Sequence, residues 1–222
     1  MKAGEELEGK GARAAHVPLL VRRNAGRTSG DLVDEARIFL ETLGATPVRG
    51  ILPDWPDFRE RKPPAARVLP AVRALERCNR AVAAGSDRLL AELVAQASSL
   101  EWRQSYSAGQ LTPEFLDNYA WTELVGPQGL APSDRLACGI LLLGPATHYP
   151  AHCHEAYELY VPLAGFARWR QGTGPWRAEP PGSVIEHASE VPHEMQTGED
   201  PLVALYLWRS NNLAQSARLA PT

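Results

Sequence analysis

Histidine is concentrated in one part of this 222-residue chain, where five of the six histidines lie between positions 148 and 193. His152 and His154 are two residues apart and Glu158 shares their parity, so on an extended chain the three side chains point to one side. His193 follows a Pro-Gly turn and a short apolar segment that can return it to the same place. Imidazole nitrogens with one carboxylate form a mixed ligand set for a divalent transition metal, with positions left open for water or substrate. We therefore expect one such ion, Zn, Fe, Mn, Co or Ni, bound by His152, His154, Glu158 and His193.

Three neighbouring residues fit this ligand set less well. His148 precedes it and is expected at the mouth of the cavity or on the surface, as a candidate for substrate contact and not as a ligand. His187 falls between two strand-like runs and is expected to be exposed, without a direct role. Cys153 alternates with His152 and His154, so it faces the other side of the chain.

The region that must position these residues consists of short apolar runs separated by glycine and proline. Each run has the length of a β-strand, and no helical pattern lies between them. Such spacing is typical of an all-β sandwich or barrel, and we predict a β domain over residues 126–222. The runs are Leu136–Leu143, Tyr157–Pro162, Phe166–Gln171, Ser183–Glu186 and Leu202–Trp208.

The first part of the chain, residues 1–125, is predicted to be an N-terminal arm followed by a helical region. Residues 1–30 show little periodicity, whereas apolar residues recur at helical spacing in several later segments. These segments are residues 31–43, 68–82 and 89–97.

Further signals in the helical region mark a helix start and a break. Thr112 and Pro113 have the residue types expected at an N-cap and at the first position of a helix. Residues 47–64 hold five prolines, which predicts a loop or an extended connection there.

The composition excludes some classes of protein. Charged residues make up 22% of the chain and the formal net charge is −3, so the chain lacks the basic excess with which nucleic-acid binders neutralise phosphates. The longest nearly apolar stretch, Leu136–Ala146, is too short to cross a bilayer, and no apolar segment typical of a secretory leader follows the polar N-terminal residues. We expect a cytoplasmic protein without nucleic-acid or membrane partners, whose helical half offers surface for a homodimer.

The histidine spacing resembles the two motifs of the cupin family. The second motif has Pro-x-Gly followed by a histidine, which corresponds here to residues 180–182 and His193. The first has His-x-His, then Glu after three residues and Gly after six more, which here are His152, His154, Glu158 and Gly165. The resemblance covers about residues 126–212. It implies a mainly β fold class, with a single C-terminal cupin (a jelly-roll-like β-barrel) preceded by an α-helical N-terminal region.

A narrower resemblance, to the cupin-type dimethylsulfoniopropionate (DMSP) lyases, rests on the tyrosines around the same motif. The segment 148–160, His-Tyr-Pro-Ala-His-Cys-His-Glu-Ala-Tyr-Glu-Leu-Tyr, is similar to the core of that family, and the helical extension and the chain length also agree. The resemblance implies cleavage of DMSP, a small zwitterion, to dimethyl sulfide and acrylate, with a metal in the barrel and a tyrosine as base.

The chain offers groups for each part of this β-elimination. A metal can bind the substrate carboxylate as a Lewis acid. Tyr160, on the same face as Glu158, is the first candidate for the base and Tyr149 the second, because a nearby dication lowers the pKa of a tyrosine. Aromatic faces tolerate a sulfonium through cation–π attraction. The candidates for substrate binding are Trp169, Tyr206, Trp208 and, at the mouth, His148.

Two other functions would use the same ligand set. An iron dioxygenase of the cupin type needs oxygen but neither tyrosine. A non-enzymatic cupin, such as a small-molecule sensor or storage module, binds without turnover. A sensor usually carries a DNA-binding domain, and the helical segments here lack the basic balance of one. Turnover that stops without oxygen would favour the dioxygenase over the lyase.

Overall fold

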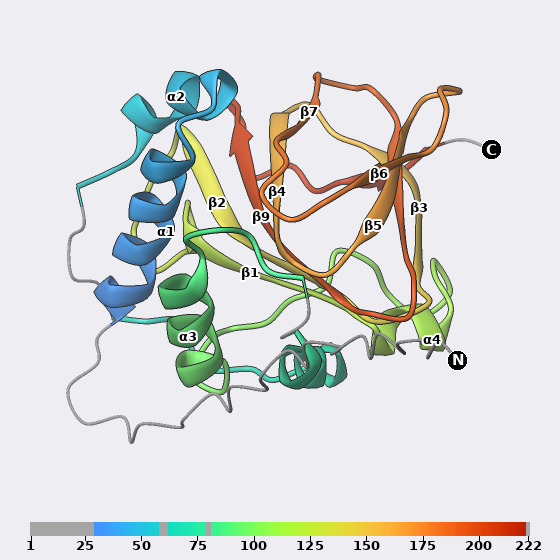
Figure 1. Cartoon of the computed structure of the whole chain (residues 1–222), viewed down its shortest axis with the longest axis horizontal. Coiled ribbons are helices and arrows are strands. Elements are labelled where there is room, and N and C mark those ends of the chain that lie inside the picture. The colour runs from blue at the N-terminus through green and yellow to red at the C-terminus, as the bar shows by residue number, and fades with distance from the viewer. Residues whose placement is uncertain (1–28, 58–61, 79–80, 221–222) are drawn as a thin grey trace, which may run out of the picture.

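The computed structural model of the chain describes residues 29–57, 62–78 and 81–220, and shows the longer helices packed on one side of a β-sandwich (Figure 1). Nearly all of the predicted N-terminal arm lies outside the described residues. The helical elements are α1 (Ser29–Leu43), α2 (Thr46–Ile51), η1 (Leu52–Asp54), η2 (Pro70–Arg77), α3 (Asp87–Gln96) and α4 (Pro113–Asp117). No helix in this part of the chain is both long enough and apolar enough to span a membrane.

The β-sandwich consists of two five-stranded antiparallel sheets, ordered β1-β2-β9-β4-β7 and β10-β3-β8-β5-β6. The strands are β1 (Tyr119–Val125), β2 (Leu136–Leu143), β3 (His148–Cys153), β4 (Tyr157–Ala164), β5 (Ala167–Gln171), β6 (Arg177–Glu179), β7 (Ile185–His187), β8 (His193–Thr197), β9 (Leu202–Arg209) and β10 (Arg218–Leu219). Helices followed by this cupin-like sandwich confirm the predicted fold class.

The first sheet is covered on both faces, which explains why β2 reads as a continuous apolar run. All eight residues of β2 are buried. Ile140 and Leu142 share a core with the inward residues of α1 and α3, whereas Ala137 and Leu141 face the other sheet. In Figure 1 the two helices lie along the side of β1 and β2 that is turned away from β5 and β6. A strand buried on both faces lacks the alternation of a half-exposed strand, and the predicted run coincides with β2.

The predicted helices are confirmed where their apolar residues pack into the core shared with β2. α1 and α3 cover the segments predicted from their spacing, and α4 begins as expected: the Thr112 hydroxyl accepts a hydrogen bond from the Phe115 amide, and Pro113 is the first residue of the helix.

The prediction of an α-helix from the apolar stripe over residues 68–82 is wrong. The segment forms the 3₁₀-helix η2, which begins at Pro70, and Val68 and Val82 are 57% and 38% exposed. A 3₁₀-helix has three residues per turn, so Ala71 and Ala74, three apart, are buried together with Leu75.

The proline-rich segment also differs from the prediction. Pro47 occupies the first turn of α2 and Pro53 lies in η1, so these prolines begin helices where we expected a loop. Proline suits the first turn because the amide it lacks would have no helical partner there. Residues 58–61 of this segment lie outside the described residues.

β1 has no counterpart in the sequence prediction, which assigned its residues to the helical region. It follows α4 after one residue, Asn118, with no glycine or proline between them. Trp121 and Glu123 of β1 lie across from Leu141 and Gly139 of β2. The division of the chain into domains at residue 126 stays a prediction.

Two glycines allow close approaches that shape the sandwich. Gly165, the glycine of the first cupin motif, has φ +82° between β4 and β5, and a Cβ there would overlap the carbonyl oxygen of Pro201. A Cβ at Gly139 would overlap the carbonyl oxygen of Thr122 and the ring of Tyr206. Gly139 therefore leaves room for the Tyr206 ring over the interior face of the sheet.

Candidate metal centre

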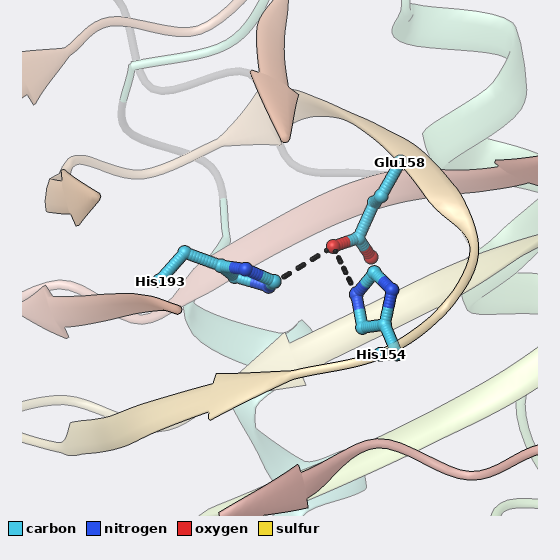
Figure 2. Close-up of side chains that lie close together, drawn as sticks. All are labelled: His154, Glu158 and His193. Carbon is cyan, nitrogen blue, oxygen red and sulfur yellow. Dashed lines mark hydrogen bonds and ion pairs between the residues drawn. The ribbon is translucent and has the colours of Figure 1, made fainter. Parts of the chain in front are cut away.

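Three of the four predicted ligands converge between the two sheets. Figure 2 shows the Glu158 carboxylate between the rings of His154 and His193. Glu158 Oε2 lies 2.9 Å from His154 Nε2 and 3.1 Å from His193 Nε2. One ligand atom from each residue lies within 4.8 Å of the others, and all three residues are buried. This spacing suits a single metal ion.

The strands bring these residues together from opposite sheets. Glu158 lies on β4 of the first sheet, and His193 begins β8 of the second. His154 follows directly after β3, whose last residues pair with β8 so that His152 lies opposite His193. A register irregularity between Tyr149 and His152 breaks the regular ladder there, as is common next to functional sites.

Backbone carbonyls orient all three imidazoles in the same way. The Nδ1 atoms of His152, His154 and His193 donate to the carbonyl oxygens of Pro150, Ala156 and Val191 at 2.9, 2.9 and 3.0 Å. A carbonyl can only accept, so Nδ1 carries the proton and the Nε2 atom of a neutral ring is left as a lone-pair donor. This is the arrangement by which proteins hold metal-binding histidines in one tautomer.

His152 lies beside this cluster but outside the closest three residues. Its ring centroid is 4.2 Å from that of His193 and 6.5 Å from that of His154. Burial, with a further effect of His193, holds its pKa well below 6.5, which keeps the ring neutral as a ligand must be. Its assignment as a fourth ligand stays a prediction.

Glu158 is a buried carboxylate whose surroundings supply positive charge. Burial alone would raise its pKa, but His154 and then His193 outweigh burial and hold the pKa of Glu158 well below 4.5. Burial likewise disfavours a charged His154, yet the Glu158 carboxylate raises the pKa of that ring above 6.5. A buried carboxylate is stabilised by a nearby positive charge, and the raised pKa of His154 shows the same attraction from the side of the imidazole.

The donor set fits a divalent transition metal on further grounds. His193 Nε2 is buried and, among the described residues, accepts or donates no hydrogen bond, although it faces Glu158. The indole Nε1 of Trp208 donates to Glu158 Oε1 at 2.5 Å, which fixes the carboxylate with its Oε2 toward the histidines. Such outer contacts orient metal-binding carboxylates. Trp208 is predicted from the sequence to contact substrate. Its contact with Glu158 has no sequence signal, because it depends on the cross-strand register of β4 and β9.

A cavity with about 710 Å³ of empty space, its open mouth included, lies against this cluster. Of the lining residues that the structure describes, those with a full charge are Glu123 and Glu158. The aromatic lining residues are Tyr119, Trp121, Tyr149, Tyr160, Tyr206 and Trp208.

Both candidate bases line the cavity. Tyr160 lies two residues after Glu158 on β4, and Tyr149 stacks on the ring of His152 with centroids 3.9 Å apart. Burial raises the pKa of both tyrosines well above 10, and the Glu158 carboxylate adds to the rise at Tyr160. A bound dication is expected to lower the pKa of these tyrosines, and it must therefore outweigh the rise that burial and Glu158 cause.

A buried chain of hydroxyl groups holds Tyr149. Its hydroxyl lies 3.1 Å from that of Tyr106 and 3.4 Å from that of Tyr119. The Tyr119 hydroxyl lies 3.0 Å from Ser105 Oγ, which accepts the indole N–H of Trp121 at 3.1 Å. Ser105 had no sequence signal, because its partner Trp121 lies on the unpredicted strand β1.

The remaining substrate-binding candidates lie in different places. Tyr206 lines the cavity, whereas Trp169 is buried against Tyr160, at 5.0 Å between centroids, and lines a separate cavity. The side chain of His148 is 49% exposed, and its Nε2 lies 2.7 Å from Glu194. His148 is therefore on the surface and outside the described lining of the first cavity, and its role in substrate contact stays a prediction.

The expected exposure of His187 is wrong. The residue is fully buried, and its ring stacks on that of His193 with centroids 4.0 Å apart and 8° between the planes. Burial, with a further effect of His193, lowers the pKa of His187 to about 3. The sequence suggested exposure because the run before it seemed to end at Glu186, whereas β7 continues through His187 and pairs it with Glu158.

The cavity also has a wall that the sequence did not indicate. It is the irregular segment before β10, and β10 itself pairs with β3 beside His152. Glu155 donates its amide to the side-chain oxygen of Gln215, at 3.3 Å, across this wall. The segment contributes Leu213, Ala214, Gln215, Ser216 and Ala217 to the lining.

Comparisons with known proteins agree with this architecture. Residues 56–204, more than half of the chain, match the family model described as dimethylsulfoniopropionate lyase. The chain is 35% identical over 118 residues to the dimethylsulfoniopropionate lyase DddQ of Ruegeria pomeroyi. That match covers 53% of this chain and 59% of the relative, so it spans less than two thirds of the curated protein.

Solved structures are similar over most of the fold. A chain from the crystal structures of the DMSP lyases RdDddP and RnDddQII superposes with a TM-score of 0.79 at 32% identity, covering 87% of this chain and 97% of that one. The DMSP lyase DddQ from Ruegeria pomeroyi superposes with a TM-score of 0.76 at 26% identity, covering 87% of this chain and 98% of that one. With a family model that matches most of the sandwich and a superposition over nearly the whole of a related chain, this protein belongs to the dimethylsulfoniopropionate lyase family.

Proposed function

We propose that the chain is a carbon–sulfur lyase that cleaves DMSP to dimethyl sulfide and acrylate in the aromatic cavity above the His/Glu cluster. The observation that carries this proposal is the buried set of His154, Glu158 and His193, whose Glu158 also lines a cavity rich in aromatic rings. Membership of the DMSP lyase family supports the substrate.

His154, Glu158 and His193 would hold one divalent transition metal, and His152 is the candidate for a fourth ligand. When bound, the ion would act as a Lewis acid toward the substrate carboxylate and favour the enolate-like charge next to it. Trp208 contributes by fixing Glu158 through its indole N–H, at 2.5 Å. Donor types alone do not choose among Zn, Fe, Mn, Co and Ni.

We assign the base to Tyr160, with Tyr149 as the second candidate. The tyrosinate oxygen removes a proton from the carbon next to the carboxylate, and the C–H electron pair becomes the carbon–carbon double bond of acrylate. The carbon–sulfur bond breaks, and its electron pair leaves on sulfur as neutral dimethyl sulfide. The position of Tyr160, on the cavity side of β4 two residues from Glu158, supports this role.

The aromatic residues on the rest of the cavity wall suit the positively charged sulfonium end of the substrate. Trp121 and Tyr206 make an edge-to-face pair, with centroids 6.3 Å apart, and Trp208 packs beside Tyr206 at 6.2 Å. Ring faces attract a sulfonium most strongly where water is excluded, and the lining acids add negative charge. These features support a zwitterion with its cation toward the rings and its carboxylate toward the metal set.

The test is product analysis with purified protein and DMSP. We expect dimethyl sulfide in the headspace and acrylate in solution in equal amounts, at the same rate in air and under nitrogen. Turnover that stops without oxygen would point to the dioxygenase, and binding of DMSP without either product would point to a binding module. Either result would contradict the proposal.

A further inference from the structure

The ring of His187 occupies a position that the proposed chemistry does not use. It comes from β7 of the first sheet and stacks on His193 of the second sheet, so the pair of rings crosses the sandwich. In the described part of the chain, neither of its nitrogens has a hydrogen-bond partner. The ring therefore acts on its surroundings through its faces and not through a hydrogen bond.

The stacking geometry argues against His187 as a ligand of the same ion. A histidine binds a metal in the plane of its ring, about 2.0–2.1 Å from the nitrogen. The rings of His187 and His193 are within 8° of parallel and their centroids are 4.0 Å apart. An ion in the plane of His193 therefore lies well out of the plane of His187.

The other contacts of His193 fix one edge of its ring, and the contact with His187 restricts rotation of the ring about that edge. The Nδ1 hydrogen bond to Val191 fixes one edge of the His193 ring, and His152 approaches with its plane at 64° to that ring. His187 covers a face of the ring, and Trp169 lies beyond it with centroids 6.2 Å apart and 31° between the planes. Rotation of His193 about its hydrogen-bonded edge would run into the His187 ring.

We propose that His187 is a positioning residue: its flat ring stacks on His193 and aims the Nε2 lone pair of His193 at the metal. This inference rests on the proposed metal site. The ring face is what matters here and the nitrogens are dispensable, because a neutral ring stacks well on an imidazole that a metal has polarised. Positioning contacts of this kind change metal affinity about 10- to 100-fold.

The test uses His187→Phe, which keeps a flat ring without nitrogens, and His187→Leu, which keeps the bulk without the flat face. Cobalt(II) affinity is measured on the full chain by competition with a chromophoric chelator, and the visible absorption bands of bound cobalt report the ligand geometry. We expect H187F to stay within about threefold of the wild type and H187L to bind about 10- to 100-fold more weakly, with altered cobalt bands. Ile185→Leu, a similar-sized change on the same strand and face, should leave both readouts unchanged.

Several results would overturn the inference. If H187F bound cobalt as weakly as H187L, a ring nitrogen would be needed for metal binding. If H187L bound cobalt as tightly as the wild type, the flat ring face would not be needed. If H187F does not fold, judged by circular dichroism of the metal-free chain, His187→Asn takes its place: Asn keeps a polar donor without the ring face and should be as weak as H187L. H187N with wild-type affinity would contradict the inference. Wild-type protein that bound no cobalt would overturn the proposed metal site itself, which is a distinguishable failure.

Discussion

The chemistry of the site depends on which atom of each side chain carries a proton. The three backbone carbonyls at His152, His154 and His193 leave every Nε2 available for a ligand, while Trp208 turns one Glu158 oxygen toward them. The Glu158 carboxylate raises the pKa of His154, and a bound cation would compete with a proton for that ring. The spacing predicted that His154, Glu158 and His193 come together, whereas the contacts that orient them depend on the fold.

Tyr160→Phe tests the base at this scale. The ring and its packing against Trp169 remain, so folding and metal content should be unchanged. Removing a general base lowers turnover by about 10²- to 10⁴-fold, and gas chromatography of headspace dimethyl sulfide measures the loss. Tyr149→Phe is the matched comparison. Full activity in Y160F with loss in Y149F would transfer the role to Tyr149.

His154→Ala should remove both metal and turnover. It should also destabilise the metal-free chain, because Glu158 then loses its nearest cationic partner in a fully buried position. Leaving one member of a buried pair alone typically lowers the free energy of unfolding by about 3–5 kcal/mol. Elemental analysis and urea unfolding measure the two effects. A variant that keeps wild-type metal content would contradict the assignment of His154 as a ligand.

At the scale of elements, sequence patterns were informative where one physical cause dominated. β2 was predictable because an eight-residue apolar run has few alternatives, and α4 because a hydroxyl cap and a proline coincide. β1 was missed because its residues are buried through contacts with α1, η2 and β2, which lie elsewhere in the chain. His187 was placed outside because the end of a three-residue strand such as β7 is set by pairing with β4 and not by residue type.

Gly165→Ala tests the turn that joins β4 to β5. An alanine there would combine a strained φ with overlap of the Pro201 carbonyl, so the backbone must move. We expect the free energy of unfolding to fall by more than about 2 kcal/mol, since left-handed backbone alone is unfavourable by about 1–2 kcal/mol for alanine. Gly172→Ala is the control, because its φ is also positive but a Cβ meets nothing within 4 Å. Equal urea midpoints for the two variants would contradict the close approach.

At the scale of the whole molecule, the helical part and the sandwich share one hydrophobic core. Residues from α1, α3 and the outer face of β2 belong to a single cluster of buried side chains. Segments before the barrel also reach the cavity, through Tyr106, which bonds to Tyr149, and Ser105. The helical region therefore supports the site directly, which composition and periodicity could not indicate.

The buried thiols and phenols predict a loss of stability at alkaline pH. Burial raises the pKa of Cys78 from 9.0 to about 12, and it also raises the pKa of Tyr119 and Tyr206 above 10. Between about pH 9 and pH 12 the unfolded chain has lost these protons while the native chain keeps them, so unfolding releases protons and its free energy falls as the pH rises. Urea midpoints at about pH 8 and pH 10.5 measure the slope. Cys78→Ala should reduce it, and a midpoint that did not fall would contradict the prediction.

The central claim is that the histidine and glutamate cluster holds a metal on which DMSP cleavage depends. The most direct measurement removes metal with a chelator, dialyses the chelator away, and follows dimethyl sulfide release as a divalent transition metal is added back stepwise. We predict negligible release from the metal-free chain and a rise that levels off at one ion per chain. Undiminished release from the metal-free chain, or no recovery with any of Zn, Fe, Mn, Co and Ni while the chain stays folded, would contradict the account.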